Sequence, residues 1–282
     1  MPALGIQFSR QIASLASSCL IDEANLTPKP GLVDRRGSGA HTDLTLDLME
    51  TSARTLKTTF EEIALTSWGR CVDSDLRSDI GLIGRTGEKR MMEVTGGINT
   101  HRGAIWTLGL LVAATSSLKS TKSLENIAQH ASALARLPDT KFRNSICSES
   151  NGLRVKRLYK KTGAREEAQA GFPHIMKKGL PTIRTNRCQG LEKSHAEINT
   201  LLSIMTTLSD TCVLSRAGPS GLKTVQEGAT KILSLGGIGT ASGAIAFYAL
   251  DKTMRQLRLS PGGAADLLAG TFFLDRLSIF NL

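Results

Sequence analysis

The sequence predicts an all-α protein, built as a compact multi-helix bundle with functional loops between the helices. Apolar residues recur three or four positions apart over long stretches, for example at Leu4, Phe8, Ile12 and Leu15. The sustained alternation of apolar and polar residues that is typical of strands is absent. The composition, with 40% hydrophobic and 21% charged residues, is that of a folded chain.

The helical periodicity locates the candidate helices in order along the chain. They span residues 4–19, 44–71, 102–115, 124–136, 198–208, 222–235, 241–257 and 261–280. Asp43 precedes one of these stretches and Ser260 precedes another, so both are predicted N-caps. Pro261 suits the first turn of the last helix, because the amide hydrogen that it lacks has no partner there in any case.

We expect one all-helical catalytic domain over residues 1–282, with two packed halves that could meet near residues 181–190. A chain of this length can bury a large core in either arrangement. No repeat of fixed period is visible, which disfavours a solenoid.

The protein is expected to stay in the cytoplasm and outside the membrane. Its longest nearly apolar stretch, residues 103–114, is shorter than the roughly 20 residues of a spanning helix. The N-terminus lacks the pattern of a secretory signal. The five cysteines form no CxxC pair, and their odd number suits a reducing compartment.

A net charge of +10 indicates an anionic partner, such as a phosphorylated metabolite, a nucleic acid or an acidic protein. The basic residues are spread singly and in pairs, and aromatic residues make up only 4% of the chain. Because neither a basic tail nor a platform for stacked bases is present, nucleic-acid binding is disfavoured.

The irregular stretch from residue 23 to 43 is the first candidate site, since long loops in compact domains are commonly functional. Its prolines and glycines form a partly stiffened loop. Such a loop could bind phosphates and Mg²⁺ or move protons, and the competing interpretation is a solvated surface loop. The side chains that it displays are Lys29, Asp34, Arg35, His41 and Asp43.

A second candidate site lies at residues 95–103, directly before the apolar helix. A glycine-rich turn at the start of a helix lets a phosphate approach unpaired backbone N–H groups. The alternative is a plain turn with Thr100 as an ordinary cap. The turn matches neither the dinucleotide fingerprint nor the P-loop. Its candidate ligand-binding residues are Gly96, Gly97, Asn99, His101 and Arg102.

Further candidates are scattered. Glu88 could be a base or a ligand, although a solvated helix face is the simpler interpretation. Cys212 is expected to be a buried structural thiol, because no histidine lies near it in the sequence. The remaining candidates are Arg165, Glu167, Asp210 and Arg216.

Together these segments resemble the triphosphoribosyl-dephospho-CoA synthase family, which serves citrate lyase and malonate decarboxylase. The resemblance is closer to the malonate decarboxylase branch. It departs from the family pattern at Ser215, where His is usual, and at Glu166, where Gly is usual. The matching motifs are TPKPGLVDRRGSGAH (27–41), TGGINTHRGAIWTLGLL (95–111), GAREEAQAGFP (163–173), DTCVLSRAG (210–218) and SPGGAADLLAGTFFLD (260–275).

The resemblance implies that the ribose 2′-hydroxyl of 3′-dephospho-CoA attacks C1′ of ATP and releases adenine. It also implies Mg²⁺ with ATP, and a downstream phosphoribosyl-dephospho-CoA transferase that receives the product. Proton transfer would fall to Asp34, His41, Asp43 and Glu88, and metal binding to Asp34, Asp43 and Asp210. Substrate binding would fall to Lys29, Arg35, Gly96, Gly97, Asn99, His101, Arg102, Arg165, Glu167 and Arg216.

Two other functions remain open at this point. An ADP-ribosyl or nucleoside hydrolase would send water to the same anomeric carbon, and a basic nucleic-acid-binding protein would bind DNA without releasing adenine. The sequence leaves the general base, the number of metal ions and a possible homodimer undetermined.

Overall fold

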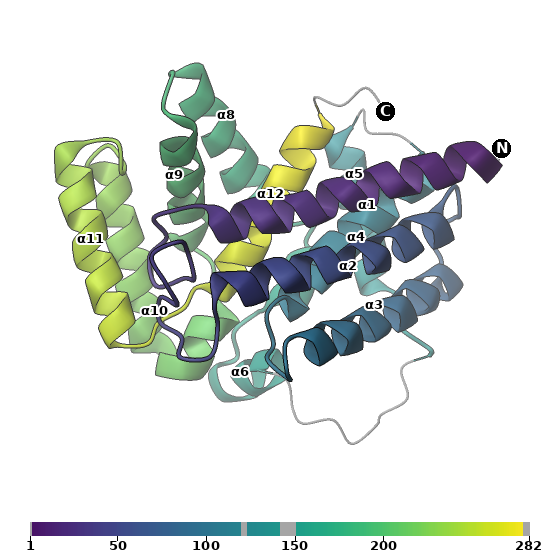
Figure 1. The fold of residues 1–282 in the computed structure, drawn as a ribbon, viewed down its shortest axis with the longest axis horizontal. Helices are drawn as coiled ribbons and strands as arrows, with labels where there is room; N and C mark the ends of the chain where they lie inside the picture. Colours follow the sequence, from purple (N-terminus) through teal and green to yellow (C-terminus); the bar gives the residue numbers. More distant parts are fainter. Residues whose placement is uncertain (1, 120–122, 142–150, 279–282) are drawn as a thin grey trace.

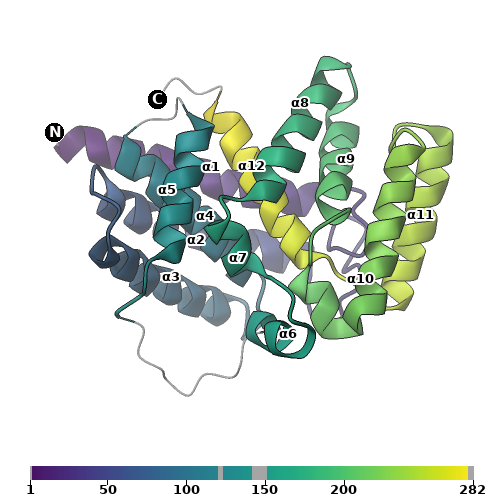
Figure 2. The same ribbon diagram turned by 180° about the vertical axis from the view of Figure 1, so that it is seen from behind.

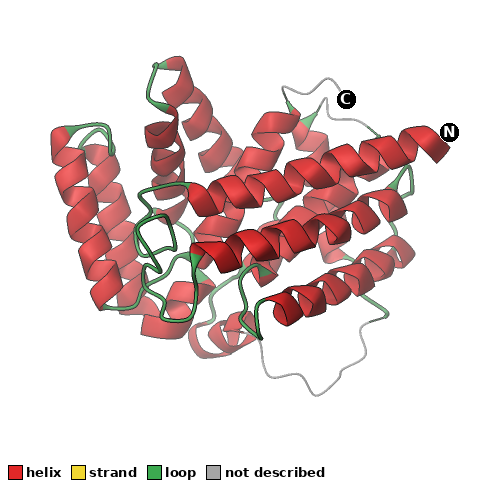
Figure 3. Cartoon of the chain, in the orientation of Figure 1, coloured by secondary structure: helices red, strands yellow, loops and turns green. Residues whose placement is uncertain are grey.

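The computed structural model describes residues 2–119, 123–141 and 151–278, and these residues fold into helices and loops without a strand (Figures 1 and 3). The predicted all-α class is confirmed. The elements are α1 (Pro2–Asn25), α2 (Leu46–Ser67), α3 (Ser74–Val94), α4 (Arg102–Leu118), α5 (Leu124–Arg136), α6 (Asn151–Tyr159), α7 (Ala164–Gln169), the π-helix η1 (Ile175–Gly179), α8 (Leu180–Cys188), α9 (Lys193–Met205), α10 (Thr211–Ser234), α11 (Ala241–Gln256) and α12 (Gly262–Leu277).

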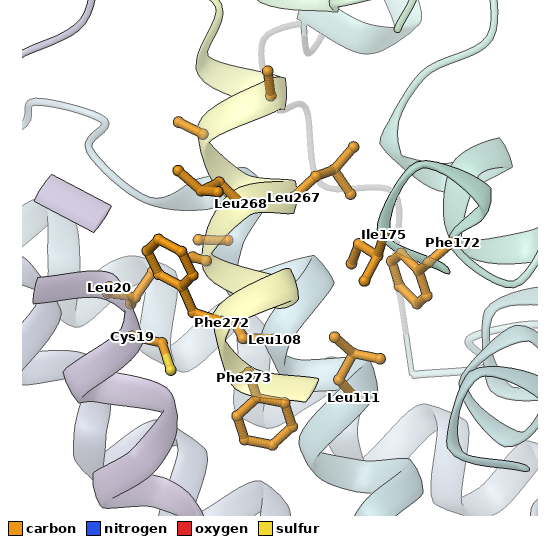
Figure 4. Close-up of a cluster of buried hydrophobic side chains, with 14 of the residues drawn as sticks. Cys19, Leu20, Leu108, Leu111, Phe172, Ile175, Leu267, Leu268, Phe272 and Phe273 are labelled. Carbon is orange, nitrogen blue, oxygen red and sulfur yellow. The ribbon is translucent and has the colours of Figure 1, made fainter. Parts of the chain in front are cut away.

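Helices α4 and α12 form the centre of the bundle. Nearly every residue of α4 from Ala104 to Ser116 is buried, and so are most residues of α12. A helix that is apolar on all sides is stable only when other helices surround it. Phe272 and Phe273 of α12 lie among side chains of α1 and α4 (Figure 4).

Most of the other helices pack against this centre, whereas α6 and α11 pack against α10. Helices α1, α2 and α3 lie side by side on one side of it, whereas α8 to α11 lie toward the other end of the molecule (Figures 1 and 2). Within residues 2–119, 123–141 and 151–278, no helix is long and apolar enough to cross a membrane.

Several segments differ from the sequence expectation, and α6, α7 and η1 are among the helices that it did not include. Helix α3 was not predicted, because glycines interrupt its weak apolar stripe, but Asp73 caps it and Leu76, Ile80 and Met91 are buried. Helix α10 begins at Thr211 rather than near residue 222, and it is kinked at Gly218. Residues 180–188 form α8 rather than a connector.

The predicted caps also differ. Thr45, not Asp43, is the N-cap of α2, and its hydroxyl oxygen accepts the Leu48 amide. Ser260 makes no cap for α12, whose first turn follows Pro261. The Ser260 hydroxyl instead contacts the ring of His41 at 2.7 Å. The serine that looked like a helix-start signal therefore lies at the candidate site.

The loop between α1 and α2 is fastened to the far end of the bundle. The Gly31 amide donates to Asp251 of α11 at 2.9 Å, and the Gly31 carbonyl accepts from Ala40. Gly31 has φ +67°, and a Cβ there would stand 2.3 Å from the Leu259 carbonyl oxygen. Only glycine permits this approach, which brings the loop against the start of α12.

Candidate active site

One cavity joins the two loops that the sequence singled out. Residues of the loop at 27–43 line it together with residues 99–103 of the turn, and α1, α2, α10 and α12 complete the wall. The loop leaves the end of α1 and passes close to α10 (Figure 1). The lining residues with polar or reactive side chains are Glu23, Lys29, His41, Asn99, Thr100, His101, Arg102, Cys212, Ser215, Arg216, Ser260 and Asp266.

His101 is a neutral hydrogen-bond donor at this cavity. Thr100 donates to the Ser52 hydroxyl oxygen, which leaves the Ser52 proton for Nδ1 of His101 at 2.8 Å. The ring proton then sits on Nε2, which has no partner among the described residues although the side chain is buried. Burial, with the charge of Lys29, lowers the pKa of His101 to about 3.

His41 also lines the cavity, and both of its ring nitrogens form hydrogen bonds. Arg216 can only donate, so Nδ1 of His41 accepts from it at 3.0 Å, and Nε2–H donates to Ser260. Burial, reinforced by Arg216, lowers the pKa of His41 to about 4, against the opposing effect of Asp43. The imidazole is therefore neutral at pH 7.

Lys29 is neutralised by a residue of α1. Its Nζ lies 2.6 Å from Glu23 Oε1, and both side chains are almost completely buried. A buried cation needs such a partner, since its desolvation is otherwise costly. The pair places one positive and one negative charge in the cavity wall, so Lys29 adds little net charge for binding phosphate.

Asp266 of α12 lies against the beginning of α4. Its carboxylate occupies the space beside Gly103, where a Cβ would stand 2.0 Å from Oδ2, and it interacts with the Ala104 amide. Burial, together with the nearby Glu23 and Asp210, raises the pKa of Asp266 well above its usual range. A raised pKa favours the protonated form of a carboxyl group, as proton donors in active sites require.

Two arginines supply the more accessible positive charge. The Arg102 side chain is 46% exposed and forms an ion pair with Glu88 of α3. Arg216 is exposed and also donates toward the backbone carbonyls of Ala40 and Arg258. Guanidinium groups at the mouth of a cavity are suited to phosphate oxygens, which accept two parallel hydrogen bonds.

Other predicted residues of the first loop lie outside the lining. Asp34 is buried and accepts from the Lys29 amide and from Arg36, so its carboxylate holds the loop together. Arg35 is exposed and directed to Asn25. Asp43 is 61% exposed and approaches Nδ1 of His41 at 3.8 Å. Their proposed roles in catalysis and binding stay predictions.

The remaining predicted residues also have structural contacts. Asp210 caps α10, because one of its carboxylate oxygens accepts hydrogen bonds from the Cys212 and Val213 amides. Its other oxygen accepts a hydrogen bond from the Ala264 amide. Glu167 accepts from the backbone and the ring of His174. Arg165, Gly96 and Gly97 lie outside the lining of this cavity and are exposed. The φ values of the two glycines are +64° and +87°.

The three carboxylates predicted to bind metal do not converge. Asp34 is paired with Arg36, Asp43 is at the surface, and the oxygens of Asp210 accept backbone amides. Within the described residues, no group of three His, Cys, Asp or Glu side chains could hold a metal ion. These residues therefore do not fit a metal site made by the protein alone.

Sequence reasoning missed Glu23, Ser260 and Asp266. Glu23 and Asp266 lie on strongly apolar helices, where periodicity indicates burial but not an adjoining cavity. The available signal was a charged residue on an otherwise buried helix, since such residues are rarely fully buried without a partner. Ser260 was identified only as a helix cap.

Comparisons with known proteins give two curated relatives that match nearly the whole chain. A curated protein of Klebsiella pneumoniae, named 2-(5″-triphosphoribosyl)-3′-dephosphocoenzyme-A synthase, is 54% identical over 95% of this chain and 94% of its own. A relative from Azotobacter vinelandii, named as a probable enzyme of the same kind, is 48% identical over 95% of this chain and 92% of its own.

A solved structure and a family model extend the comparison. The crystal structure of an Archaeoglobus fulgidus protein shares the fold with a TM-score of 0.54 at 16% identity, over 81% of this chain and 98% of that one. The model of the ATP:dephospho-CoA triphosphoribosyl transferases matches residues 9–281. With this match over nearly the whole length, the chain belongs to the ATP:dephospho-CoA triphosphoribosyl transferase family.

Proposed function

We propose that this protein is a transferase that forms 2′-(5″-triphosphoribosyl)-3′-dephospho-CoA from ATP and 3′-dephospho-CoA, with release of adenine. The observation that carries the proposal is the single cavity in which the two glycine-rich loops, two arginines and a carboxyl group of raised pKa meet. The name of the relative that is 54% identical supports the same reaction.

The reaction exchanges one bond at C1′ of the ATP ribose. The C1′–N bond breaks, and its electron pair leaves with adenine, while the 2′-hydroxyl oxygen of dephospho-CoA bonds to C1′ and loses its proton. Adenine therefore needs a proton donor, and the hydroxyl needs an acceptor. Negative charge beside the ribose stabilises the positive charge that develops during this exchange.

Asp266 is the proposed proton donor to adenine, because it lines the cavity and its raised pKa favours the protonated carboxyl group. The proposed acceptor is the neutral ring of His41, whose Nδ1 is released when Arg216 turns to a phosphate. Because Glu23 is already paired with Lys29, the negative charge beside the ribose develops on Asp266 as it gives up its proton. His101 donates from Nε2 to a substrate oxygen and thereby satisfies an otherwise unpaired buried group.

Arg102 and Arg216 are proposed to hold the triphosphate. Mg²⁺ is proposed to arrive bound to the phosphates of ATP, because Mg²⁺ keeps several waters and commonly takes few protein ligands. We also propose that the product serves malonate decarboxylase through a downstream phosphoribosyl-dephospho-CoA transferase in the cytoplasm. The free thiols of all four described cysteines suit that compartment.

The test is to incubate the purified protein with ATP, Mg²⁺ and 3′-dephospho-CoA and to detect adenine chromatographically. We expect adenine only when dephospho-CoA is present, and a product that has gained the mass of a triphosphoribosyl group. Adenine release without dephospho-CoA would indicate a hydrolase and overturn the proposal. Absence of adenine under all conditions would also overturn it.

A further inference from the structure

A second cavity opens between α2, α3 and α4, beside the first one. Its volume is about 200 Å³, smaller than the ~300–1,000 Å³ of pockets that enclose a drug-sized ligand. It therefore suits a slender chain better than a nucleotide. Its lining consists of Ile63, Arg77, Ile80, Gly81, Gly84, Arg85, Glu88, Arg102, Ile105, Trp106, Gly109, Leu110 and Asp139.

The width of this groove depends on glycines where the helices face each other. Gly84 of α3 has no positive φ, and a Cβ there would meet only Ile105, at 3.7 Å. The backbone therefore does not require glycine, which weakens a helix interior by ~1 kcal/mol relative to alanine. The absence of a side chain at this position leaves open space in the groove between apolar walls.

The far end of the groove contains a donor that lacks a partner. Arg77 packs its guanidinium over Trp106 at 5.3 Å, and its Nη1 lies 3.4 Å from Asp139. Its Nε is buried and has no hydrogen-bond partner among the described residues. A neutral carbonyl from a ligand would satisfy this donor without bringing another charge into the groove.

The near end of the groove reaches the first cavity. Arg102 lines both cavities, and its partner Glu88 lines the groove. The part of α3 from Arg77 to Glu88 is ~16 Å long at 1.5 Å per residue. The pantetheine arm of dephospho-CoA has a backbone comparable to four or five extended residues, or ~15 Å. The stretch of α3 that lines the groove is therefore about as long as the arm, and the Arg77 guanidinium reaches into the groove over Trp106.

From these observations we infer that the groove between α3 and α4 binds the pantetheine arm of dephospho-CoA. The adenosine end of that substrate and ATP then meet in the first cavity. The inference rests on the proposed function, since it locates the second substrate of that reaction. The arm is uncharged and slender, which suits the narrow groove with its apolar walls. Its amide carbonyls can accept a hydrogen bond from the buried Nε of Arg77.

The sharpest variant is Gly84→Leu, which fills the groove from a helical position that accepts a side chain. We expect the KM for dephospho-CoA to rise at least tenfold and the KM for ATP to change less than twofold. Thr86→Leu is the matched control, because Thr86 is exposed on the same helix, and it should leave both values unchanged. Equal KM values for dephospho-CoA in Gly84→Leu and wild type would overturn the inference.

A second measurement needs no variant. Free pantetheine should inhibit the wild-type protein competitively against dephospho-CoA and not against ATP. Binding titrations with dephospho-CoA should show at least a tenfold loss in Gly84→Leu when its thermal melting curve is unchanged. If the wild-type protein forms the product but pantetheine does not compete, the groove assignment fails and the proposed function stands. If no product forms with the wild type, the proposed function itself fails.

Discussion

The loop at 27–43 and the segment at 99–103 both border the cavity, but they use their polar residues differently. In the loop, the charges of Asp34 and Lys29 are paired with neighbouring groups of the protein. A hydrogen bond also joins the loop to α11. In the segment, His101 keeps an unpaired donor and Arg102 remains half exposed. A charge in a loop rich in glycine and proline can thus serve to shape the site rather than to bind the ligand.

The largest expected effect is at Asp266, whose carboxyl group lies beside the segment at 99–103. Asp266→Asn keeps the size and an oxygen acceptor for the Ala104 amide but removes the transferable proton. We expect kcat for adenine release to fall by ~100-fold or more, the usual scale for a general acid. The thermal melting temperature shows whether folding is retained, and Asp47→Asn, at an exposed position of α2, is the control. Loss of less than threefold would refute the role.

The next effect contrasts two arginines. Arg216→Gln removes a guanidinium from the cavity lining, and we expect the KM for ATP to rise ~10-fold, which corresponds to ~1.4 kcal/mol of charge-assisted hydrogen bonding. Arg35→Gln changes an exposed residue outside the lining, and its KM should stay within twofold of wild type. Steady-state kinetics with varied ATP measure both. An equal rise of the KM for ATP in the two variants would show that arginines inside and outside the cavity lining do not differ in ATP binding.

The buried histidine should make stability depend on pH. His101 stays neutral in the folded protein down to about pH 3, whereas it takes up a proton below about 6.5 when unfolded. The unfolded state therefore binds more protons between these values, and the free energy of unfolding falls as the pH falls through this window. For His101, the loss amounts to about 2 kcal/mol between pH 7 and pH 5.

The variant His101→Gln isolates this contribution. Urea unfolding at pH 7 and pH 5 should show a smaller difference between the two conditions in the variant, by about 2 kcal/mol. His41, with its pKa lowered to about 4, would still add its own pH dependence in both proteins. The same difference in wild type and variant would contradict the neutral buried state of His101.

The smallest effect concerns Glu166, at the beginning of α7. Its carboxylate accepts the Gly163 amide at 3.0 Å and thereby caps α7, and it also contacts Lys156 at the surface. Glu166→Ala should lower the free energy of unfolding by ~0.5–1 kcal/mol and leave adenine release within twofold. Denaturant titration and the adenine assay measure the two effects. A large loss of activity would give Glu166 a role that the structure does not show.

The sequence predicted the helices whose apolar residues recur strongly, such as α1, α4 and α12. It did not reveal α3, because Gly81, Gly84 and Gly87 reduce its helical signal and its burial depends on packing against neighbours. Of the site, it identified the residues in loops, including His41, His101 and Arg102. It missed Glu23 and Asp266, because a carboxylate on an apolar helix looks the same in sequence whether it faces a core, a partner or a cavity.

By itself, the sequence determined the helical class and the glycine-rich segments, because periodicity and backbone freedom are local properties of the chain. Only the tertiary structure decided which charges are neutralised by neighbours and which remain available to a ligand. Glu23 and Lys29 come from one end of the chain, and Asp266 comes from the other. The pairing of Glu23 with Lys29 and the raised pKa of Asp266 depend on burial and on distances between helices, which no local pattern encodes.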